Sequence, residues 1–254
     1  MLNIFRMDLH RFITNKIMYI LLLVFCAFQI FGIFMFKQYA QPIQAGGIDI
    51  SKMNESEFIQ HLFSQPPSWI LIYIFVFCVY FYFSEYNSGF YKNYITMKKA
   101  RVYSVVSKIL VQAIFTVFMM VAMVVSDLIG RGIFFDNTSI GDLGYFAKLL
   151  IGLFLLLWAF SILILCTSIF TRSMLVSFGI ALVLVLNVVG MIFAVLESLL
   201  DNVYLSQYLL VSTIYSTFDY NHVRDLIHIA SVATVTLLLF AFIAIRLKIK
   251  EDLR

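Results

Sequence analysis

The residues of this chain that are spaced to do chemistry gather in one polar stretch, residues 85–101. A Glu-x-x-x-Gly-x-x-Lys-Asn pattern begins at Glu85, and further basic residues follow it at Lys98, Lys99 and Arg101. Between them stand apolar and aromatic side chains, three of which share one face of a helix: Tyr91, Tyr94 and Ile95. A short helix with an apolar face and a basic rim is suited to docking, onto a partner protein or onto the lipid surface.

Patterns that support catalysis are absent from the sequence. No glycine is followed by lysine, so the glycine-rich phosphate loop of ATPases cannot form. The metalloprotease pattern His-Glu-x-x-His and the hydrolase pattern Gly-x-Ser-x-Gly are missing as well. We therefore expect that the chain is not an enzyme and holds no cofactor of its own.

The cysteines and histidines do not form a ligand set. Cys26, Cys78 and Cys166 are far apart within apolar runs, where a free cysteine behaves as a small hydrophobic residue. The four histidines are scattered over different segments: His10, His61, His222 and His228. No metal site is expected.

The elements that must position the polar stretch are membrane-spanning helices. The 254 residues are 62% hydrophobic and 13% charged, with a mean hydropathy of +0.96, whereas a soluble domain is about a quarter charged. A helix needs about 20 apolar residues to cross a ~30 Å hydrocarbon core. Six uncharged runs qualify, so the chain is predicted to be an all-α, polytopic membrane domain over 1–254, with spans at about 17–36, 68–84, 105–126, 148–171, 173–196 and 226–245.

The distribution of charge predicts the orientation. Six spans place both termini on one side, together with residues 85–104 and the tight connection at Arg172. That side holds 13 of the 18 basic residues and four of the 14 acids, so its net charge is +9, whereas the net charge of the opposite side is −5. Basic residues gather in cytoplasmic segments of membrane proteins, so both termini are predicted to be cytoplasmic, in a cell membrane.

The segments outside the spans carry their own patterns. Residues 1–16 read as an amphipathic helix at the membrane surface, with a solvated tail as the alternative. A short helix is expected over 54–63, capped by Asn54 or Ser51. The loop 197–225 is rich in apolar residues, which predicts short re-entrant or outer helices there.

The acids argue against an ion relay. Ion-coupled transporters place ionisable groups at bilayer depth, where such groups are costly and functional. All 14 acids, Asp127 included, fall outside the six runs or at their edges. Energy for any transport is therefore expected to come from a partner.

One family shares this layout. The pattern at Glu85, followed by basic residues and by Tyr103-Ser104 and Ser107-Lys108, resembles the first cytoplasmic loop of type-2 ABC exporter permeases. The resemblance implies a coupling helix within 85–104 that fits a separate ATPase, where ATP and Mg are bound. It also implies two ATPase copies and a second permease, identical or paralogous. Carried over by position, the coupling residues are Glu85, Tyr86, Gly89, Lys92, Asn93, Tyr94 and Met97, with Arg172 as a minor contact.

Small and aromatic residues mark two of the spans. In the fifth span, small residues recur at helical spacing and one amide lies near the middle: Ser173, Ser177, Ala181, Asn187 and Gly190. Such a stripe allows close helix packing, either within the chain or, as the resemblance implies, against a second subunit beside the pathway. In the second span, Tyr73, Phe77 and Tyr80 share a face that suits core packing, an interface belt or a lipid-like substrate.

The expected substrate is the one that a resemblance to known permeases implies. In its small size and its composition rich in Ile, Phe, Lys and Asn, the chain resembles bacterial permeases of Gram-positive peptide exporters and bacteriocin-immunity systems, such as exporters of phenol-soluble modulins. The resemblance implies amphipathic peptides, toxins or antimicrobial peptides, or lipid-like molecules as cargo, and no nucleic-acid partner. The alternative is a non-transporting membrane sensor or assembly scaffold whose cytoplasmic loop docks a different partner.

Overall fold

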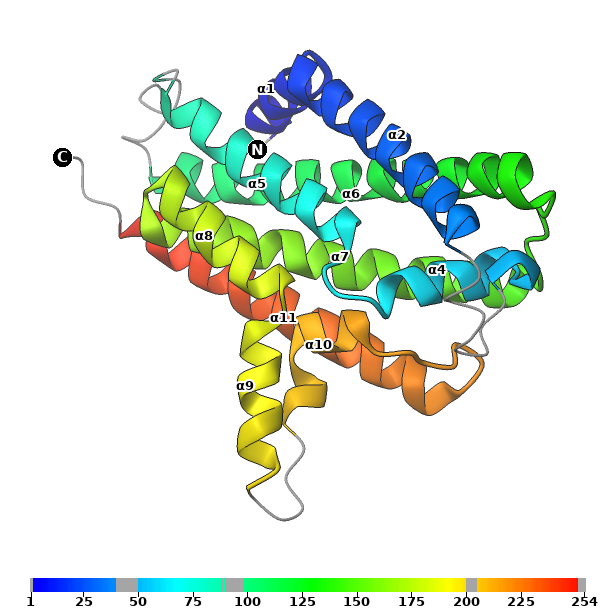
Figure 1. Cartoon of the computed structure of the whole chain (residues 1–254). Coiled ribbons are helices and arrows are strands. Elements are labelled where there is room, and N and C mark those ends of the chain that lie inside the picture. The colour runs from blue at the N-terminus through cyan, green and yellow to red at the C-terminus, as the bar shows by residue number, and fades with distance from the viewer. Residues whose placement is uncertain (1, 40–49, 88, 90–97, 200–204, 251–254) are drawn as a thin grey trace.

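The regular elements of the described chain are all helices, which confirms the predicted fold class (Figure 1). The computed structural model describes residues 2–39, 50–87, 89, 98–199 and 205–250. Its α-helices are α1 (Leu2–Ile13), α2 (Lys16–Gln38), α4 (Glu55–Phe63), α5 (Trp69–Asn87), α6 (Lys98–Phe135), α7 (Leu143–Thr171), α8 (Met174–Val185), α9 (Val188–Glu197), α10 (Leu210–Tyr215) and α11 (Val223–Ile249). Two short 3₁₀ helices, η1 (Ile50–Lys52) and η3 (Ser206–Tyr208), complete them.

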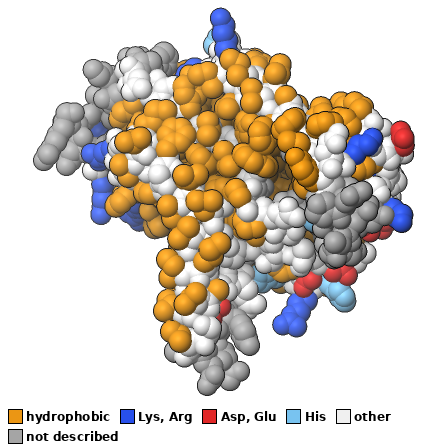
Figure 2. Space-filling view, in the orientation of Figure 1, with side chains coloured by type: hydrophobic (Ala, Val, Ile, Leu, Met, Phe, Trp, Pro, Cys, Tyr) orange, Lys and Arg blue, Asp and Glu red, His pale blue; other side chains and the backbone are white. Residues whose placement is uncertain are grey.

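Five of these helices are long and apolar enough to cross a membrane: α2, α5, α6, α7 and α11. Helices α5 and α7 form the buried centre, because most of their aliphatic and aromatic side chains pack into one hydrophobic core. Helix α11 runs along α7, while α2 runs along α6 (Figure 1). The outward faces are apolar as well, and Figure 2 shows hydrophobic side chains over most of one face of the molecule. Lipid is the solvent that such a surface requires.

Helix α6 corrects the predicted third span. The expected bounds were about 105–126, but the helix covers 38 residues, from Lys98 to Phe135. Its uncharged stretch lies between Lys108 and Asp127, which at 1.5 Å per residue are about 28 Å apart along the axis. The helix therefore extends beyond the hydrocarbon core at one end or both, and it begins inside the segment predicted as a loop.

The fifth span is broken, contrary to the expectation of one helix over 173–196. Helices α8 and α9 meet at a bend of 47° at Asn187, which adopts the left-handed conformation with φ 52°. Beyond the bend, α9 points away from the bundle (Figure 1). Asn187 gains the hydrogen-bond partner expected for a polar group there, because the Ser212 hydroxyl donates to its Oδ1 at 3.2 Å.

The apolar outer loop folds back onto the bundle through α10. Leu210, Val211 and Ile214 are buried, which explains why this loop is so hydrophobic. The Tyr215 hydroxyl donates to the carbonyl of Val185 at 2.5 Å and accepts from the Ser68 amide at 3.2 Å. Short helices in this loop were predicted; whether they enter the membrane stays a prediction.

The predicted surface helix near residue 54 is confirmed as α4. Asn54 is its N-cap and accepts from the Glu57 amide at 3.0 Å, while the Glu57 carboxylate accepts from the Asn54 amide at 2.9 Å. This reciprocal capping box fixes the start of the helix.

Candidate functional site

The candidate site lies where the predicted cytoplasmic ends of four helices meet. Glu85, in the last turn of α5, is 2% exposed. Its carboxylate accepts from Arg11 of α1 at 2.9 Å and pairs with Lys108 of α6 at 2.6 Å. Arg11 and Glu85 are 74 positions apart, so the fold and not the local sequence assembles the cluster.

Arg11 and Lys108 are held in place by further bonds. Arg11 donates to Asp8 at 3.1 Å, to the Ser84 hydroxyl at 3.1 Å and to a carbonyl of α5, and its guanidinium lies over the Phe81 ring. Lys108 donates to Ser104 one turn earlier at 2.8 Å and lies 3.7 Å from Asp8. Two acids and two bases balance in charge, which removes most of the cost of burying them.

Tyr86 connects the same end of α5 to the end of α11. The Lys248 ammonium donates to the Tyr86 hydroxyl at 2.9 Å and lies 4.7 Å from the centre of that ring. Nearby, Arg101 of α6 donates to the carbonyl of Ile249 at 3.2 Å. The last turn of α5 therefore contacts α1 and α11, and the first turn of α6 contacts the end of α11.

The connection itself is shorter than predicted. Helix α5 continues to Asn87 and α6 begins at Lys98, so the expected loop 85–104 reduces to residues 88–97. Gly89 has φ +68°, and its amide donates to the Tyr86 carbonyl at 3.1 Å. A Cβ at Gly89 would meet open space, so the backbone angle, not crowding, favours glycine. The predicted coupling residues Lys92, Asn93, Tyr94 and Met97 lie outside the described residues.

Arg172 forms the connection between α7 and α8. It ends α7 in the left-handed conformation with φ 53°, and its amide donates to the Ser168 carbonyl. Its side chain is exposed and available to a partner. The next residue, Ser173, is half-buried and starts α8, and its carbonyl accepts from the Ser177 hydroxyl at 2.8 Å.

The predicted subunit or pathway residues pack mostly within the chain. Ser177, Ala181 and Gly190 are buried within the chain, whereas Ser173 and Asn187 are half-buried, and contact of this stripe with a second subunit stays a prediction. Phe77 is fully buried and stacks on Phe115 at 3.8 Å. The small residues Ser177 and Ala181 of α8 allow close packing inside the chain. Tyr73 and Tyr80 are half-buried, and Tyr73 packs edge-on against Phe25.

A second ionic cluster lies toward the opposite end of α6, around Asp127, the residue predicted to lie at the edge of a span. Asp127 and Arg131 lie inside α6 and are fully buried, as is Glu55 of α4. Arg131 pairs with Glu55 at 2.6 Å, and Gln29 of α2 donates to Asp127 at 2.7 Å. The i, i+4 spacing of Asp127 and Arg131 was the one signal in the sequence, since it places both on one helical face.

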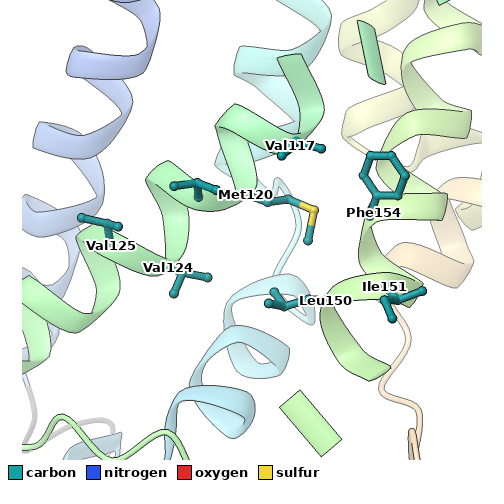
Figure 3. A pocket seen from close by; sticks show the side chains of 8 residues that line it. Val117, Met120, Val124, Val125, Leu150, Ile151 and Phe154 are labelled. Carbon is teal, nitrogen blue, oxygen red and sulfur yellow. The ribbon is translucent and has the colours of Figure 1, made fainter. Parts of the chain in front are cut away.

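An apolar groove of about 360 Å³ lies between α6 and α7 (Figure 3). Its lining includes Val117, Met120, Val124, Leu150, Ile151 and Phe154. These side chains offer no strong hydrogen-bonding group, so the groove suits a hydrocarbon chain and not a polar reactant.

Among the described residues no group of three or more His, Cys, Asp or Glu side chains is placed to hold a metal ion. The cysteines are free, with Cys78 and Cys166 buried.

A family model matches this chain over residues 9–190, from α1 into α9, and its description is ABC-2 family transporter protein. The match spans well over half of the sequence. The chain belongs to the ABC-2 transporter family. No curated protein matches it.

Membership of the ABC-2 family makes this chain the membrane permease of an ABC transporter and implies partnership with an ABC ATPase subunit. Such permeases are membrane subunits that are generally not catalytic. Both ionic clusters fall within the matched residues except for Asp8, which precedes the match by one position, whereas α10 and α11 follow it. The contacts of Lys248 are thus outside the part of the permease that the family model describes.

Proposed function

We propose that this permease forms the substrate pathway of an ABC exporter, and that residues 88–97 receive motion from the ATPase. The observation that carries the proposal is the buried cluster at Glu85. Because the last turn of α5 is bonded to α1 and α6, a push on the following segment would move three helices together. Arg172, exposed in the connection between α7 and α8, would be the minor contact.

The proposed cargo is an amphipathic peptide, such as a toxin or antimicrobial peptide, or a lipid-like molecule. The apolar groove between α6 and α7 and the exposed apolar helix faces support a cargo with a hydrocarbon side. The assembly would contain two ATPase copies and a second permease, identical or paralogous.

Reconstitution tests this function. Proteoliposomes holding the permease and its ATPase are given ATP and a fluorescent amphipathic helical peptide, and peptide accumulation is measured. We expect transport that requires both the ATPase and ATP. Peptide movement by the permease alone would contradict the proposal.

Two arginines of α1 provide a matched pair for the coupling step. Arg11 belongs to the buried cluster, whereas Arg6, one turn earlier, is exposed. We expect Arg11→Gln to reduce ATP-driven transport at least about tenfold, since it leaves Glu85 short of a partner, whereas Arg6→Gln changes little. Arg11→Lys, which keeps the charge, should recover part of the loss. Equal transport by Arg11→Gln and Arg6→Gln would refute a coupling role, provided that both variants co-purify with the ATPase.

A further inference from the structure

The charges buried at the outer end of α6 do not balance. Among the described residues, the fully buried charged groups there are Asp127, Glu55 and Arg131, two carboxylates against one guanidinium. The inner cluster, in contrast, sets two acids against two bases. An uncompensated charge cannot be buried without a large cost, so the outer cluster must take up a positive charge.

Arg131 is committed to residues other than Asp127. Its Nη1 donates to Glu55 at 2.6 Å, its Nη2 donates to the Met53 carbonyl, and its guanidinium lies over the Phe58 ring at 5.5 Å. The remaining nitrogen, Nε, is buried and has no hydrogen-bond partner. The guanidinium therefore ties α6 to α4 and to the segment before it.

Asp127 is left with one neutral partner. Its Oδ1 accepts from the Gln29 amide at 2.7 Å, and its Oδ2 is buried with no hydrogen-bond partner. Among the described groups that face it, α2 offers the uncharged Gln29, α4 offers the like-charged Glu55, and α6 offers Arg131, which Glu55 already uses. An ionised Asp127 would thus be fully buried with one neutral hydrogen-bond donor in place of its hydration, which is a costly state.

Glu55 supports the same conclusion from the other side of the cluster. Burial raises the pKa of Glu55 above its ordinary value, although the hydrogen bond and the charge of Arg131 oppose the rise. The Arg131 guanidinium therefore does not offset the cost of desolvating Glu55, its own partner. It stabilises a second carboxylate even less.

Two cavities lie beside Gln29, the hydrogen-bond partner of Asp127. Gln29 lines a cavity of about 230 Å³ between α2 and the connection from α4 to α5, together with Gln65, Pro66 and Trp69. On its inner side, Gln29 also lines a hollow of about 30 Å³ that reaches Met123, one turn before Asp127 on α6. A hollow of that size has room for one water molecule, and Gln29, which lines both cavities, is the residue that donates to the Asp127 carboxylate.

We propose that Asp127 is a proton-binding site, reached from the outer side past Gln29, and that the bound proton keeps α2 and α4 docked on α6. Loss of the proton places two negative charges beside one guanidinium and favours separation of α4 from α6. The inference goes beyond the proposed transport function and does not depend on it.

Unfolding as a function of pH tests the site. The full-length chain is purified in detergent micelles, and its unfolding equilibrium is measured from pH 5.5 to 8.5 for the wild type, Asp127→Asn and Asp136→Asn. Asparagine at 127 keeps the shape and stays neutral at every pH. Asp136 is the matched control, because it is exposed at the end of α6 and has φ 51°, which asparagine tolerates.

The stability of the fold depends on pH because folding is linked to proton binding at Asp127. The folded chain holds a proton that the unfolded carboxyl releases near pH ~3.9, so the stabilisation is complete below that pH and is lost as pH rises. Relative to Asp127→Asn, the unfolding constant of the wild type should rise up to about tenfold per pH unit, until the folded chain itself releases the proton. The Asp136→Asn variant should follow the wild type. A ratio between wild type and Asp127→Asn that is constant with pH would overturn the proposal.

A second measurement does not depend on unfolding. The infrared carbonyl band of a protonated carboxyl group should be present at neutral pH in the wild type and in Asp136→Asn, and weaker by one group in Asp127→Asn. An unchanged band would refute the proton site. Stabilisation of the wild type by added Na⁺ at constant pH, lost in Asp127→Asn, would also overturn it and identify a sodium site.

Discussion

At the scale of single residues, the permease buries charge in two ways that have different consequences. The inner cluster at Glu85 pairs its acids with its bases, and removing one partner from such a pair costs about 3–5 kcal/mol because the other charge is left uncompensated. The outer cluster has a carboxylate in excess. The first arrangement is a rigid fastening, and the second is able to respond to protons.

Gly89 gives the sharpest test at this scale. Its φ of +68° is easy for glycine, tolerated by asparagine and costly for alanine, by roughly 1–2 kcal/mol. A side chain there would meet no neighbour within 4 Å, so the two substitutions differ in backbone preference and not in crowding. We expect Gly89→Ala to lower ATP-driven transport several-fold and Gly89→Asn to stay near the wild type. Equal losses in both would show that the turn at Gly89 does not matter for coupling.

At the scale of elements, the break between α8 and α9 is built from a few polar and small residues. Asn187 takes the left-handed angle, Ser212 of α10 bonds to it, and Gly190 allows the approach. A Cβ on Gly190 would lie 2.3 Å from Asn187 Oδ1 and from Ser212 Oγ. The position of α10 against α9 therefore depends on the absence of a side chain at residue 190.

Two helical glycines make a matched pair for this element. Gly190→Ala should push α10 away, at a cost of about 1–3 kcal/mol, whereas Gly179→Ala in α8 adds a methyl group to open space and should favour the helix slightly. Amide hydrogen exchange over residues 210–215 is the measurement, and about tenfold faster exchange is expected for Gly190→Ala alone. If both variants exchanged like the wild type, α10 would not be held by this contact.

At the scale of the whole molecule, the two ionic clusters lie on either side of the apolar stretch of α6. Lys108 and Asp127 are about 28 Å apart along that helix, close to the thickness of the hydrocarbon core. Around this level the exposed side chains of α2, α6, α8 and α11 are apolar (Figure 2). The clusters thus fix the helix ends near the two membrane surfaces, where charge is least costly.

The orientation is testable by labelling. Single cysteines are placed at Asn221, exposed before α11, and at Thr14, exposed after α1, in a chain whose half-buried Cys26 is replaced by serine. If the termini are cytoplasmic, as the basic residues predict, a membrane-impermeant thiol reagent on intact cells labels Asn221→Cys and leaves Thr14→Cys unlabelled. After lysis both should react. The reverse pattern would place residues 88–97 outside the cell and end the coupling proposal.

Local patterns predicted much of this fold. The all-helical class followed from composition, and the short helix near residue 54, with Asn54 as one of two candidate caps, followed from residues a few positions apart. The patterns missed helix ends and breaks: α6 continues past Asp127, where Gln29 donates to Asp127 and Arg131 pairs with Glu55, and α8 stops at Val185, where α10 supplies partners at the bend. In both cases the deciding contact comes from a distant part of the chain.

The sequence by itself determined which solvent the chain requires, since long uncharged runs can lose water only in lipid or in a protein core, and it indicated Glu85 as a residue of interest. Only the tertiary structure decided that Glu85 is buried between Arg11 and Lys108, that the small stripe of α8 is covered within the chain, and that Asp127 has only the uncharged Gln29 as a hydrogen-bond partner among the described residues. Hydrophobic transfer is a sum over residues and can be read from composition, whereas the balance of a buried charge depends on which side chains packing brings within a few ångströms.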